Sequence, residues 1–379
     1  MARRKKKLPL WLRVSCFLLV VAVVLGYLYY QKVYLPKQQQ DLYGKEVVYD
    51  YAENEITFHF PMLGNEDNGD CTYIKAGDKD ILIDAGSNAS SITTIKNYVD
   101  KYCTDGVLEY VIVTHAHADH YAGFVYKNNI FDYYDCEVII DFPLTNKTAT
   151  NQNSEYAKYL ANRDKEVEDG AVRYSALECV KEQNGAKKVY ELASNITMEI
   201  LYQKYYEQPS LDLEDENDYS VCVMFNHAGR KFLFTGDLEA TGEESLVESN
   251  DLGEVALYKA GHHGSSTSSS DKLLNVIKPK ICVVPCVAGV DEHTSNQANT
   301  FPTQEFINRI SKHTDKVYAP TLGEESMVGE DKFLPLNGDI KIVSKDTKVS
   351  IVCSNSTQLL RETEWFKSNR EMPSAWNFQ

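Results

Sequence analysis

An apolar run at residues 110–113 ends in the sequence THAHADH, which places three histidines and one aspartate within six positions. Such a run indicates a buried strand, and the chain turns where a strand ends, so side chains at i, i+2, i+4 and i+5 can converge on one point. Imidazole and carboxylate are ligands that zinc and similar transition metals prefer. His115, His117, Asp119 and His120 are therefore predicted metal ligands rather than solvated loop residues.

Three further stretches carry an acid or a histidine directly after an apolar run. They are Asp84 in ILIDAG, Asp237 in FLFTGD, and the pair His262 and His263 in YKAGHHGSSTSSS. A single strand-end aspartate is more often a turn residue or a helix cap. The recurrence of the pattern nevertheless favours a site assembled along one edge of an α/β fold, where strand ends meet.

After Glu55 the chain alternates short strand-like runs, such as DILIDAG, CEVII and YSVCVMF, with helical segments such as SSITTIKNYVDKYC and SDKLLNVIKP. This alternation predicts a layered α/β domain rather than an all-α or all-β one. The polar, helix-prone span from about residue 145 to residue 188 interrupts the pattern, and we predict a surface insertion there.

The first 30 residues differ in character from the rest. Six basic residues within the first 13 positions precede any acid, and residues 14–30 are apolar or aromatic apart from Ser15. This pattern predicts a single helix across the lipid bilayer with its basic end in the cytoplasm, which places everything after Lys32 outside. A cleaved signal peptide is the alternative, but LGYLYYQKVYLPK offers no small-residue cleavage site.

The charge of the remaining chain limits its partners. Without those six basic residues the net charge changes from −16 to −22. A body this acidic offers no basic stripe, so we do not expect it to bind nucleic acid tightly. The nine cysteines are scattered without a CxxC pair, and no disulfide framework is evident.

The motif THAHADH resembles the HxHxDH signature of the metallo-β-lactamase superfamily, and Asp84 and Asp237 fall where that family places its acids. The stretches GDCTYIKAGDKDILIDAG, NDYSVCVMFNHAGRKFLFTGDLE and LYKAGHHGSSTSSS are similar to the hydrolase domain of ComEC-type competence proteins and their stand-alone relatives. The resemblance covers about residues 56–353. It implies a four-layer αββα sandwich of the α/β class with one or two divalent metal ions at its edge.

The resemblance also implies metal ligands. His115 and His117 would hold a first ion, Asp119 and His120 a second, and Asp237 would bridge the two. The expected ion is Zn²⁺, with Mn²⁺ or Fe²⁺ as alternatives. Asp119 is in addition a candidate catalytic residue.

The remaining candidates would stand beside the ions. Asp84 is the expected hydrogen-bond acceptor that orients a ligand. His262 and His263 are candidate catalytic residues that could complete a coordination sphere or bind an anionic group of the substrate, and we expect His262 to be the nearer metal ligand. Lys259 and Ser265 could cradle an anionic oxygen, unless the Ser/Thr run is only a helix-capping linker.

The sequence departs from the family pattern at two places. A typical member supplies another metal histidine between His120 and Asp237, and here His227, at the end of a strand, is the candidate. ComEC-type chains tend to carry a late His-Pro, where this chain has Phe301-Pro302; His293, in the preceding loop, is the candidate substitute, against an ordinary surface histidine. A mononuclear centre or a labile second ion therefore stays open.

These features predict a membrane-anchored, extracytoplasmic metal-dependent hydrolase. A divalent ion supplies hydroxide at neutral pH, which suits a phosphoryl centre. The expected substrate is an anionic phosphodiester or phosphoester of the cell surface or of a small molecule, rather than long DNA. The alternatives are a non-catalytic, membrane-tethered binding module, which the loss of the late His-Pro favours, and a lactam or thioester hydrolase.

The predicted organisation has four parts. They are a basic tail and transmembrane signal-anchor at residues 1–30, a polar tether at 31–54, a metallo-β-lactamase-like hydrolase domain at 55–354 and a C-terminal tail at 355–379.

Overall fold

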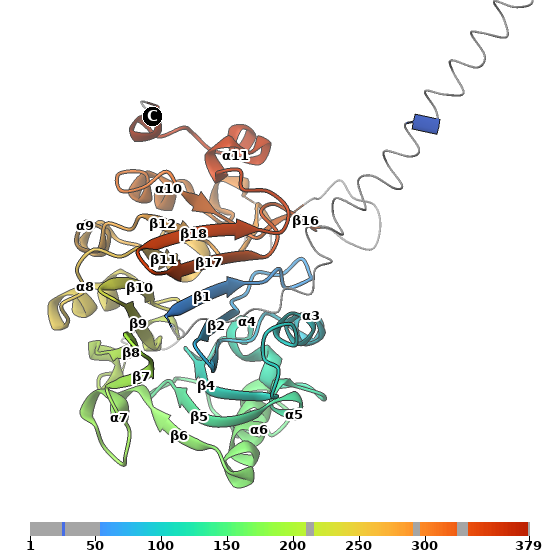
Figure 1. Ribbon diagram of the computed structural model, residues 1–379, viewed down its shortest axis with the longest axis vertical. Helices are drawn as coiled ribbons and strands as arrows, with labels where there is room; N and C mark the ends of the chain where they lie inside the picture. The colour runs from blue at the N-terminus through green and yellow to red at the C-terminus, as the bar shows by residue number, and fades with distance from the viewer. Residues whose placement is uncertain (1–24, 27–53, 210–215, 291–295, 324–332, 378–379) are drawn as a thin grey trace, which may run out of the picture. The chain divides into compact units, whose positions relative to one another are not determined.

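The computed structural model describes residues 25–26, 54–209, 216–290, 296–323 and 333–377, and Figure 1 traces their helices and strands. Residues 1–50 and residues 51–379 form two units, and the elements described below all belong to the second. The predicted anchor and tether lie outside the described residues, apart from Leu25, Gly26 and Asn54. None of the described helices is both long and apolar enough to cross a membrane.

The first sheet has eight strands in the order β18-β17-β1-β2-β3-β4-β5-β6. Its strands are β1 Glu55–Phe60, β2 Thr72–Ala76, β3 Lys79–Ile83, β4 Val107–Val113, β5 Asp135–Asp141, β6 Val172–Ser175, β17 Ile340–Lys345 and β18 Lys348–Cys353. β3 to β6 run parallel, and the others pair antiparallel. The interior strand β4 is an almost continuous apolar run, because parallel strands of this kind are covered on both faces.

The second sheet has seven strands in the order β14-β12-β11-β10-β9-β8-β7. Its strands are β7 Val189–Ala193, β8 Ile196–Leu201, β9 Cys222–His227, β10 Arg230–Phe234, β11 Leu257–Lys259, β12 Ile281–Val283 and β14 Val317–Tyr318. A small third sheet contains β13 Val287–Ala288, β15 Thr321–Gly323 and β16 Phe333–Pro335.

The two large sheets stack face to face through aromatic side chains. Phe58 of β1 stacks on Phe232 of β10 with ring centroids 4.6 Å apart, and on Phe234 at 5.5 Å. Leu233, between those two phenylalanines, belongs to a second core cluster. This period of two places alternate residues of β10 on opposite faces of its sheet. One face therefore packs against the first sheet and the other against helices.

Helices cover the outer faces of both sheets, which gives the αββα order of layers (Figure 1). The described helices of this unit are α3 Ala89–Val99, α4 Ala118–Tyr121, α5 Ile130–Tyr133, α6 Glu155–Asp169, α7 Ala176–Lys181, α8 Ala240–Ser249, α9 Asp271–Ile277, α10 Gln304–Ile310 and α11 Glu364–Asn369. Polar side chains that accept a backbone N–H hydrogen bond cap several of them at the N-terminus, as Asn88 does for α3, Ser270 for α9 and Thr303 for α10.

The span from residue 145 to residue 188, predicted as a surface insertion, is part of the sandwich. Its helix α6 buries Tyr159, whose ring stacks on Tyr121 with centroids 5.4 Å apart. Its strand β6 extends the first sheet in parallel with β5. The prediction was wrong because α6 buries few residues, so that its sequence looks polar throughout although Tyr159 is packed.

Residues 355–379, predicted as a C-terminal tail, pack against the helical side of the second sheet where the structure describes them. Leu360, Phe366 and Trp376 are buried in the same cluster as Phe306 of α10. Trp376 Nε1 also donates a hydrogen bond to the Thr314 carbonyl at 3.0 Å. Aromatic side chains bury a large apolar area, which accounts for the docking of this segment.

Candidate metal centre

The four stretches singled out in the sequence meet at one edge of the sandwich. Asp84 follows β3, and THAHADH follows the neighbouring parallel strand β4. Asp237 follows β10, and the two adjacent histidines lie in the 3₁₀ turn η5, Gly261–Gly264, which follows the parallel strand β11. Parallel neighbours bring their carboxyl ends to the same edge, so each sheet contributes two of these segments.

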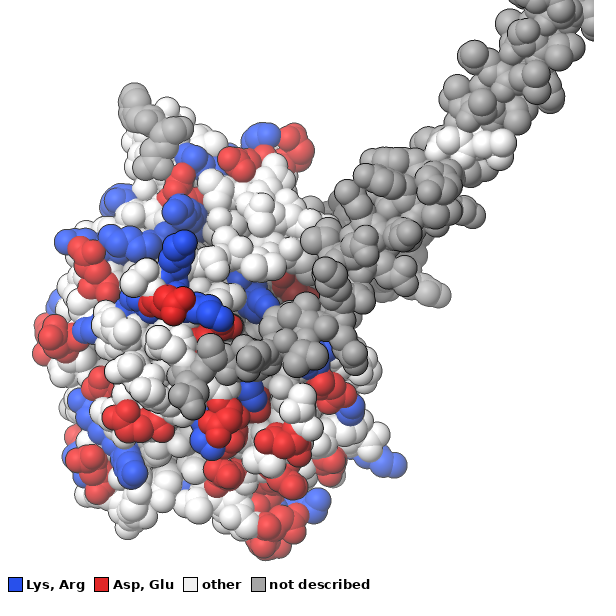
Figure 2. All heavy atoms as spheres, viewed as in Figure 1, with Lys and Arg blue, Asp and Glu red and all other residues white. Residues whose placement is uncertain are grey.

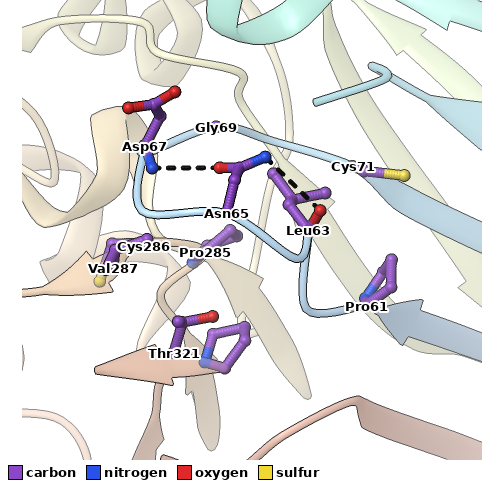
Figure 3. Close-up of a pocket in the computed structure, with 11 residues that line it drawn as sticks. Pro61, Leu63, Asn65, Asp67, Gly69, Cys71, Pro285, Cys286, Val287 and Thr321 are labelled. Atoms are coloured by element: carbon purple, nitrogen blue, oxygen red, sulfur yellow. Dashed lines mark hydrogen bonds between the residues drawn. The ribbon is translucent and has the colours of Figure 1, made fainter. Parts of the chain in front are cut away.

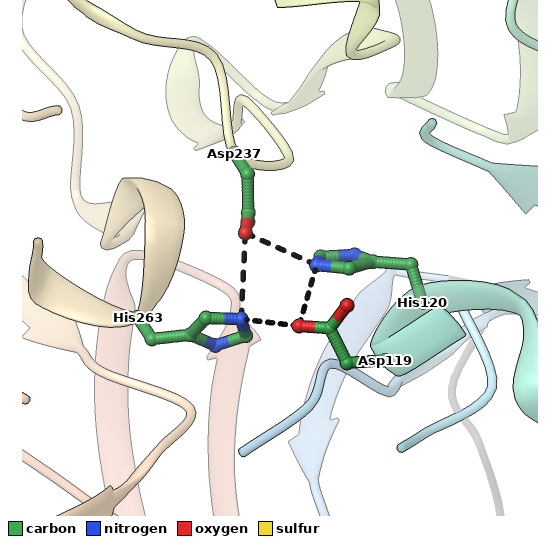
Figure 4. A group of neighbouring side chains, drawn as sticks. All are labelled: Asp119, His120, Asp237 and His263. Atoms are coloured by element: carbon green, nitrogen blue, oxygen red, sulfur yellow. Dashed lines mark hydrogen bonds and ion pairs between the residues drawn. The ribbon is translucent and has the colours of Figure 1, made fainter. Parts of the chain in front are cut away.

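Asp119, His120, Asp237 and His263 point toward one another at this edge (Figure 4). One ligand atom of each lies within 4.8 Å of the others. Asp237 Oδ2 is 3.1 Å from His120 Nε2 and 3.3 Å from His263 Nε2, and Asp119 Oδ2 is 3.1 Å from His263 Nε2. The Asp119 side chain is 26% exposed and the other three are buried, so the cluster opens to solvent beside Asp119.

The second ring nitrogen of each clustered histidine is held by an acceptor. His120 Nδ1 donates to Asp84 Oδ2 at 2.8 Å, and His263 Nδ1 donates to the Pro285 carbonyl at 2.8 Å. Asp84 itself accepts hydrogen bonds from the Thr114 backbone N–H and hydroxyl, each at 2.8 Å. Because these contacts hold the proton on Nδ1, Nε2 of both rings faces the carboxylates as a potential ligand atom.

The charges within the cluster depend on one another. Burial by itself lowers the pKa of His120 and of His263, but nearby carboxylates, with Asp237 foremost, raise both pKa values well above the ordinary range. Burial also acts to raise the pKa of Asp237, yet His120, His263 and Lys259 hold it well below its usual range. A divalent cation could take the place of the protons that neutralise these carboxylates.

The donor set fits a divalent metal ion. Two carboxylates and two imidazoles suit Zn²⁺, Mn²⁺ and Fe²⁺ alike. His120 Nε2 is buried, and its partner in this structure is Asp237 Oδ2 at 3.1 Å. The four ligand atoms lie within 4.8 Å of one another, as the ligands of one ion must.

His115 and His117 lie next to this cluster and face each other. His115 Nε2 is 3.0 Å from His117 Nδ1, and the His115 and His120 ring centroids are 4.1 Å apart. Burial lowers the pKa of both His115 and His117, so both favour the neutral form that binds metal. Among the described residues, His115 and His117 belong to no close group of three or more possible metal ligands, unlike Asp237.

The structure reverses the expected order of the two adjacent histidines. His263 is the one that reaches Asp119 and Asp237, whereas His262 Nδ1 lies 3.2 Å from Thr267 Oγ1 and 3.4 Å from Glu239 Oε1. Both histidines have positive φ, 45° and 51°, in the left-handed region that non-glycine residues rarely adopt. Consecutive left-handed residues send the two side chains in different directions, which the sequence does not indicate.

Lys259 and Ser265 are both buried and contact neighbouring groups of the protein. Lys259 is buried and forms ion pairs with Asp70 and Asp237. Ser265 is also buried, and its hydroxyl lies 3.0 Å from that of Thr267, within the turn. In this structure the Lys259 ammonium group and the Ser265 hydroxyl are thus both engaged by other side chains.

His227, a candidate metal ligand, does not join the cluster in the structure. His227 ends β9, and its ring nitrogens lie 2.9 Å from Ser344 Oγ and 3.1 Å from Asn54 Oδ1. Because β9 runs antiparallel to β10, its last residue lies at the opposite edge from Asp237. His293 lies outside the described residues.

Asp70 is a buried member of the site that the sequence analysis did not single out. Its carboxylate forms an ion pair with Lys259, and Oδ1 lies 3.4 Å from His263 Nδ1. Asp70 precedes β2, whose start lies at the same edge as the end of the antiparallel strand β3. The available signal was its position directly before the apolar run CTYIKA, the mirror image of the strand-end pattern.

A small hollow lies between the segment around Gly69 and the segment around Pro285 (Figure 3). Its lining includes Gly69 and Cys71, the chain neighbours of Asp70, together with Pro285, whose carbonyl holds His263. The described residues that line it include none of the four clustered donors. The open side at Asp119 is therefore the better candidate for substrate approach.

Gly236 allows Asp237 to reach the cluster. It has φ +54°, and a Cβ there would lie 2.8 Å from Ser220 Oγ and 3.0 Å from Thr114 Cβ. The Ser220 hydroxyl accepts a hydrogen bond from Asp237 N at 3.0 Å. The glycine of FTGD is thus required both by its left-handed conformation and by the close approach of neighbouring chain segments.

Glu243 of α8 holds the segment that follows the histidine turn. Its buried carboxylate accepts hydrogen bonds from Ser269 N at 2.6 Å and Ser270 N at 2.7 Å. On the other side of this segment, the Arg309 guanidinium donates to the Ser268 and Ser269 carbonyls. Burial raises the pKa of Glu243 to about 7, against the opposing effect of these hydrogen bonds and of Arg309.

This pKa predicts a pH-dependent stability. A carboxyl group whose pKa is higher in the folded state binds more protons when folded, so its contribution is present below about pH 4.5 and is lost as pH rises to about 7. We expect the free energy of unfolding of the wild type, relative to Glu243→Gln, to fall by at most about 3 kcal/mol over that range. Denaturant unfolding of both chains in chelator at several pH values measures it.

Glu244→Gln is the matched control for this experiment. Glu244 is an exposed neighbour whose pKa is lowered by its hydrogen bond to Lys272. Its removal should give a pH trend of the opposite sign. A difference between the wild type and Glu243→Gln that stays constant across this range would contradict the prediction.

The stacked sheets and the donor cluster at their edge can now be compared with known proteins. Residues 64–192 match the family model of the metallo-beta-lactamase superfamily, so the resemblance noted in the sequence is confirmed. The chain is 36% identical over 108 residues to competence protein ComA of Neisseria gonorrhoeae, a match that covers 27% of this chain and 14% of ComA.

Two further similarities are shorter or more distant. Exodeoxyribonuclease WalJ of Streptococcus pneumoniae is 30% identical over 70 residues, which is 18% of this chain and 25% of WalJ. The solved structure of YhfI, a metallo-beta-lactamase fold protein from Bacillus subtilis, aligns with a TM-score of 0.38 at 10% identity and covers 69% of this chain and 95% of YhfI. The matched part of this chain thus spans a quarter or less of these two curated relatives.

Proposed function

We propose that this chain is a metal-dependent hydrolase of an anionic phosphodiester or phosphoester. The observation that carries the proposal is the cluster of Asp119, His120, Asp237 and His263, whose ligand atoms lie within 4.8 Å of one another. When bound, a divalent ion would supply Lewis acidity and a nucleophile derived from water at neutral pH. Local similarity to a protein named as an exodeoxyribonuclease supports a phosphodiester as the substrate class.

Each residue of the cluster has a defined task in this proposal. His120 and His263 would bind the ion through Nε2, since their Nδ1 protons are held by Asp84 and the Pro285 carbonyl. Asp237 would contribute Oδ2, and Asp119, the partly exposed member, would contribute a carboxylate ligand on the side that faces solvent. His115 and His117 would bind a second, weaker ion, because the described residues place no third acid, histidine or cysteine in a close group with them.

The partly exposed side chains of His262 and Glu239, next to the cluster, suit contact with a polar substrate. His262 is 23% exposed and Glu239 is 26% exposed. Thr267 Oγ1 donates a hydrogen bond to Glu239 Oε1 at 2.8 Å and lies 3.2 Å from His262 Nδ1. We assign His262 to contact with the substrate rather than with the ion.

The acidity of the chain supports a small or cell-surface ester over long DNA. On the face shown in Figure 2, basic groups lie among acidic ones. With a net charge of −16, the chain would gain little from counterion release along a nucleic-acid backbone.

The test is hydrolysis of bis(p-nitrophenyl) phosphate by the purified full-length chain, with Zn²⁺ or Mn²⁺ added after removal of metal by a chelator. We expect activity that the chelator abolishes and the ion restores. A lactam and a thioester serve as comparison substrates. A chain that binds metal and hydrolyses none of the three would instead be a binding module that retains the fold.

We also propose that the chain is anchored in the membrane by its N-terminal segment, with the hydrolase domain outside the cytoplasm. The support is the basic cluster followed by residues 14–30, which are apolar or aromatic apart from Ser15. Protease added to intact cells should digest the domain and leave a small membrane fragment. Protection of the domain until the cells are lysed would contradict this arrangement.

A further inference from the structure

Lys259 is a buried lysine at the centre of the acidic side of the site. Its side chain is 3% exposed at the end of β11. Nζ forms an ion pair with Asp70 Oδ2, lies 3.3 Å from Asp237 Oδ1 and donates a hydrogen bond to the Gly236 carbonyl at 2.9 Å. A buried ammonium group persists only with such partners, so its place behind the cluster is fixed by the fold.

The ion pair between Lys259 and Asp70 joins the two sheets. Asp70 belongs to the first sheet's side of the site, because its N–H donates to the Asp119 carbonyl at 3.0 Å and its carbonyl accepts from Gly86 N at 2.7 Å. Lys259 belongs to the second sheet. The pair therefore crosses the sandwich at the edge where the donors meet.

The donors are divided between the sheets in the same way. Asp119 and His120 follow β4 of the first sheet, whereas Asp237 and His263 follow β10 and β11 of the second. Any relative shift of the sheets at this edge would separate one pair from the other. A bound ion could hold the pairs together, but before it binds the cross-sheet contacts must do so.

Lys259 also separates the two oxygens of Asp237. Oδ1 faces the ammonium group, and Oδ2 faces His120 Nε2 and His263 Nε2. This contact fixes the rotation of the carboxylate about its last bond. A single oxygen of Asp237 is therefore presented to the cluster.

We propose that Lys259, paired with Asp70, is a positioning residue that holds the donors of one sheet against those of the other before metal binds. The inference rests on the proposed function of the cluster as a metal site. A positioning role and a purely electrostatic role of Lys259 predict opposite changes in metal affinity when the lysine is removed. A lysine that acted only through its charge would repel a divalent cation, so its removal would tighten metal binding, whereas loss of a positioning residue weakens it.

The experiment measures Zn²⁺ affinity of the full-length, metal-free chain by competition with a chromophoric chelator. Lys259→Met keeps the length and apolar stem of the side chain and removes the charge. We expect Zn²⁺ to bind at least about tenfold more weakly, as happens when residues that orient ligands are lost. The rise in melting temperature caused by Zn²⁺ should shrink accordingly.

A second variant removes both charges at once. Lys259→Met combined with Asp70→Asn leaves the net charge of the chain unchanged. It also avoids a buried, unpaired carboxylate at position 70, so it is expected to fold even if Lys259→Met alone does not. It should also weaken Zn²⁺ binding. Lys231→Met is the matched control, since Lys231 of β10 donates to the Asp251 and Leu252 carbonyls, away from the cluster, and should leave the affinity unchanged.

The outcomes separate this inference from the proposed function. Tighter or unchanged Zn²⁺ binding in Lys259→Met, with the wild type binding normally, overturns the positioning role alone. If Lys259→Met loses the same thermal stability with and without Zn²⁺, the lysine stabilises only the fold, and the positioning role is also overturned. A wild type that binds no divalent ion overturns both, whereas a wild type that binds Zn²⁺ without hydrolysis leaves this inference fully measurable.

Discussion

Asp237→Asn is expected to remove bound metal and hydrolysis together. Asp237 Oδ2 is the atom that lies within 3.3 Å of both His120 Nε2 and His263 Nε2, so it links the donors of the two sheets. The amide keeps the shape of the side chain but loses the negative charge that a cation needs. We expect hydrolysis to fall by more than the roughly 10–100-fold that is typical for residues that only orient ligands. Elemental analysis beside the phosphodiesterase rate measures both.

Asp141→Asn is the matched control for this variant. Asp141 is also a buried aspartate at a strand end, but it pairs with Arg163 and Arg173 and lies outside the donor cluster. Its replacement should lower stability and leave the metal content intact. Full metal content together with a wild-type rate in Asp237→Asn would remove Asp237 from the proposed centre.

His263→Ala is expected to weaken metal binding strongly, and His262→Ala is expected to leave it unchanged. His263 Nε2 lies 3.1 Å from Asp119 and 3.3 Å from Asp237, so its loss removes one of four clustered donors. Metal affinity should then fall by more than about 100-fold, beyond the range for outer residues. His262 faces Thr267 and Glu239 instead, and His262→Ala should keep its metal.

The two variants control for each other because both remove an imidazole from the same turn. Each residue also has positive φ, so each substitution changes the backbone preference in the same way. Zn²⁺ titration of both variants therefore compares side-chain roles directly. Metal loss in His262→Ala with retention in His263→Ala would restore the order expected from the sequence.

The local chemistry of the site could be predicted from the sequence. THAHADH puts its donors within six positions after a strand, so that Asp119 and His120 reach the cluster and His115 and His117 lie next to it. The acids after β3 and β10 follow from the same rule, because the end of an apolar run marks the end of a strand. The alternation of apolar runs and helical segments likewise predicts the α/β layers.

The packed status of weakly patterned segments could not be predicted in this way. The helix α6 buries Tyr159 within a polar sequence, and Trp376 docks near the end of the chain. In both cases the partner surface comes from residues distant in the sequence. Composition within a short window does not contain that information.

The sequence by itself determined which residue types gather at the edge, and the tertiary structure decided which of them face one another. His262 and His263 are neighbours in the chain, and only contacts with Pro285 on one side and Thr267 on the other show which ring enters the cluster. Lys259 turns inward because Asp70, 189 positions earlier, provides a buried counter-charge from the other sheet. The physical reason is that strand ends are fixed by local backbone preferences, whereas the direction of a side chain depends on charges and packing surfaces that only the stacked sheets bring together.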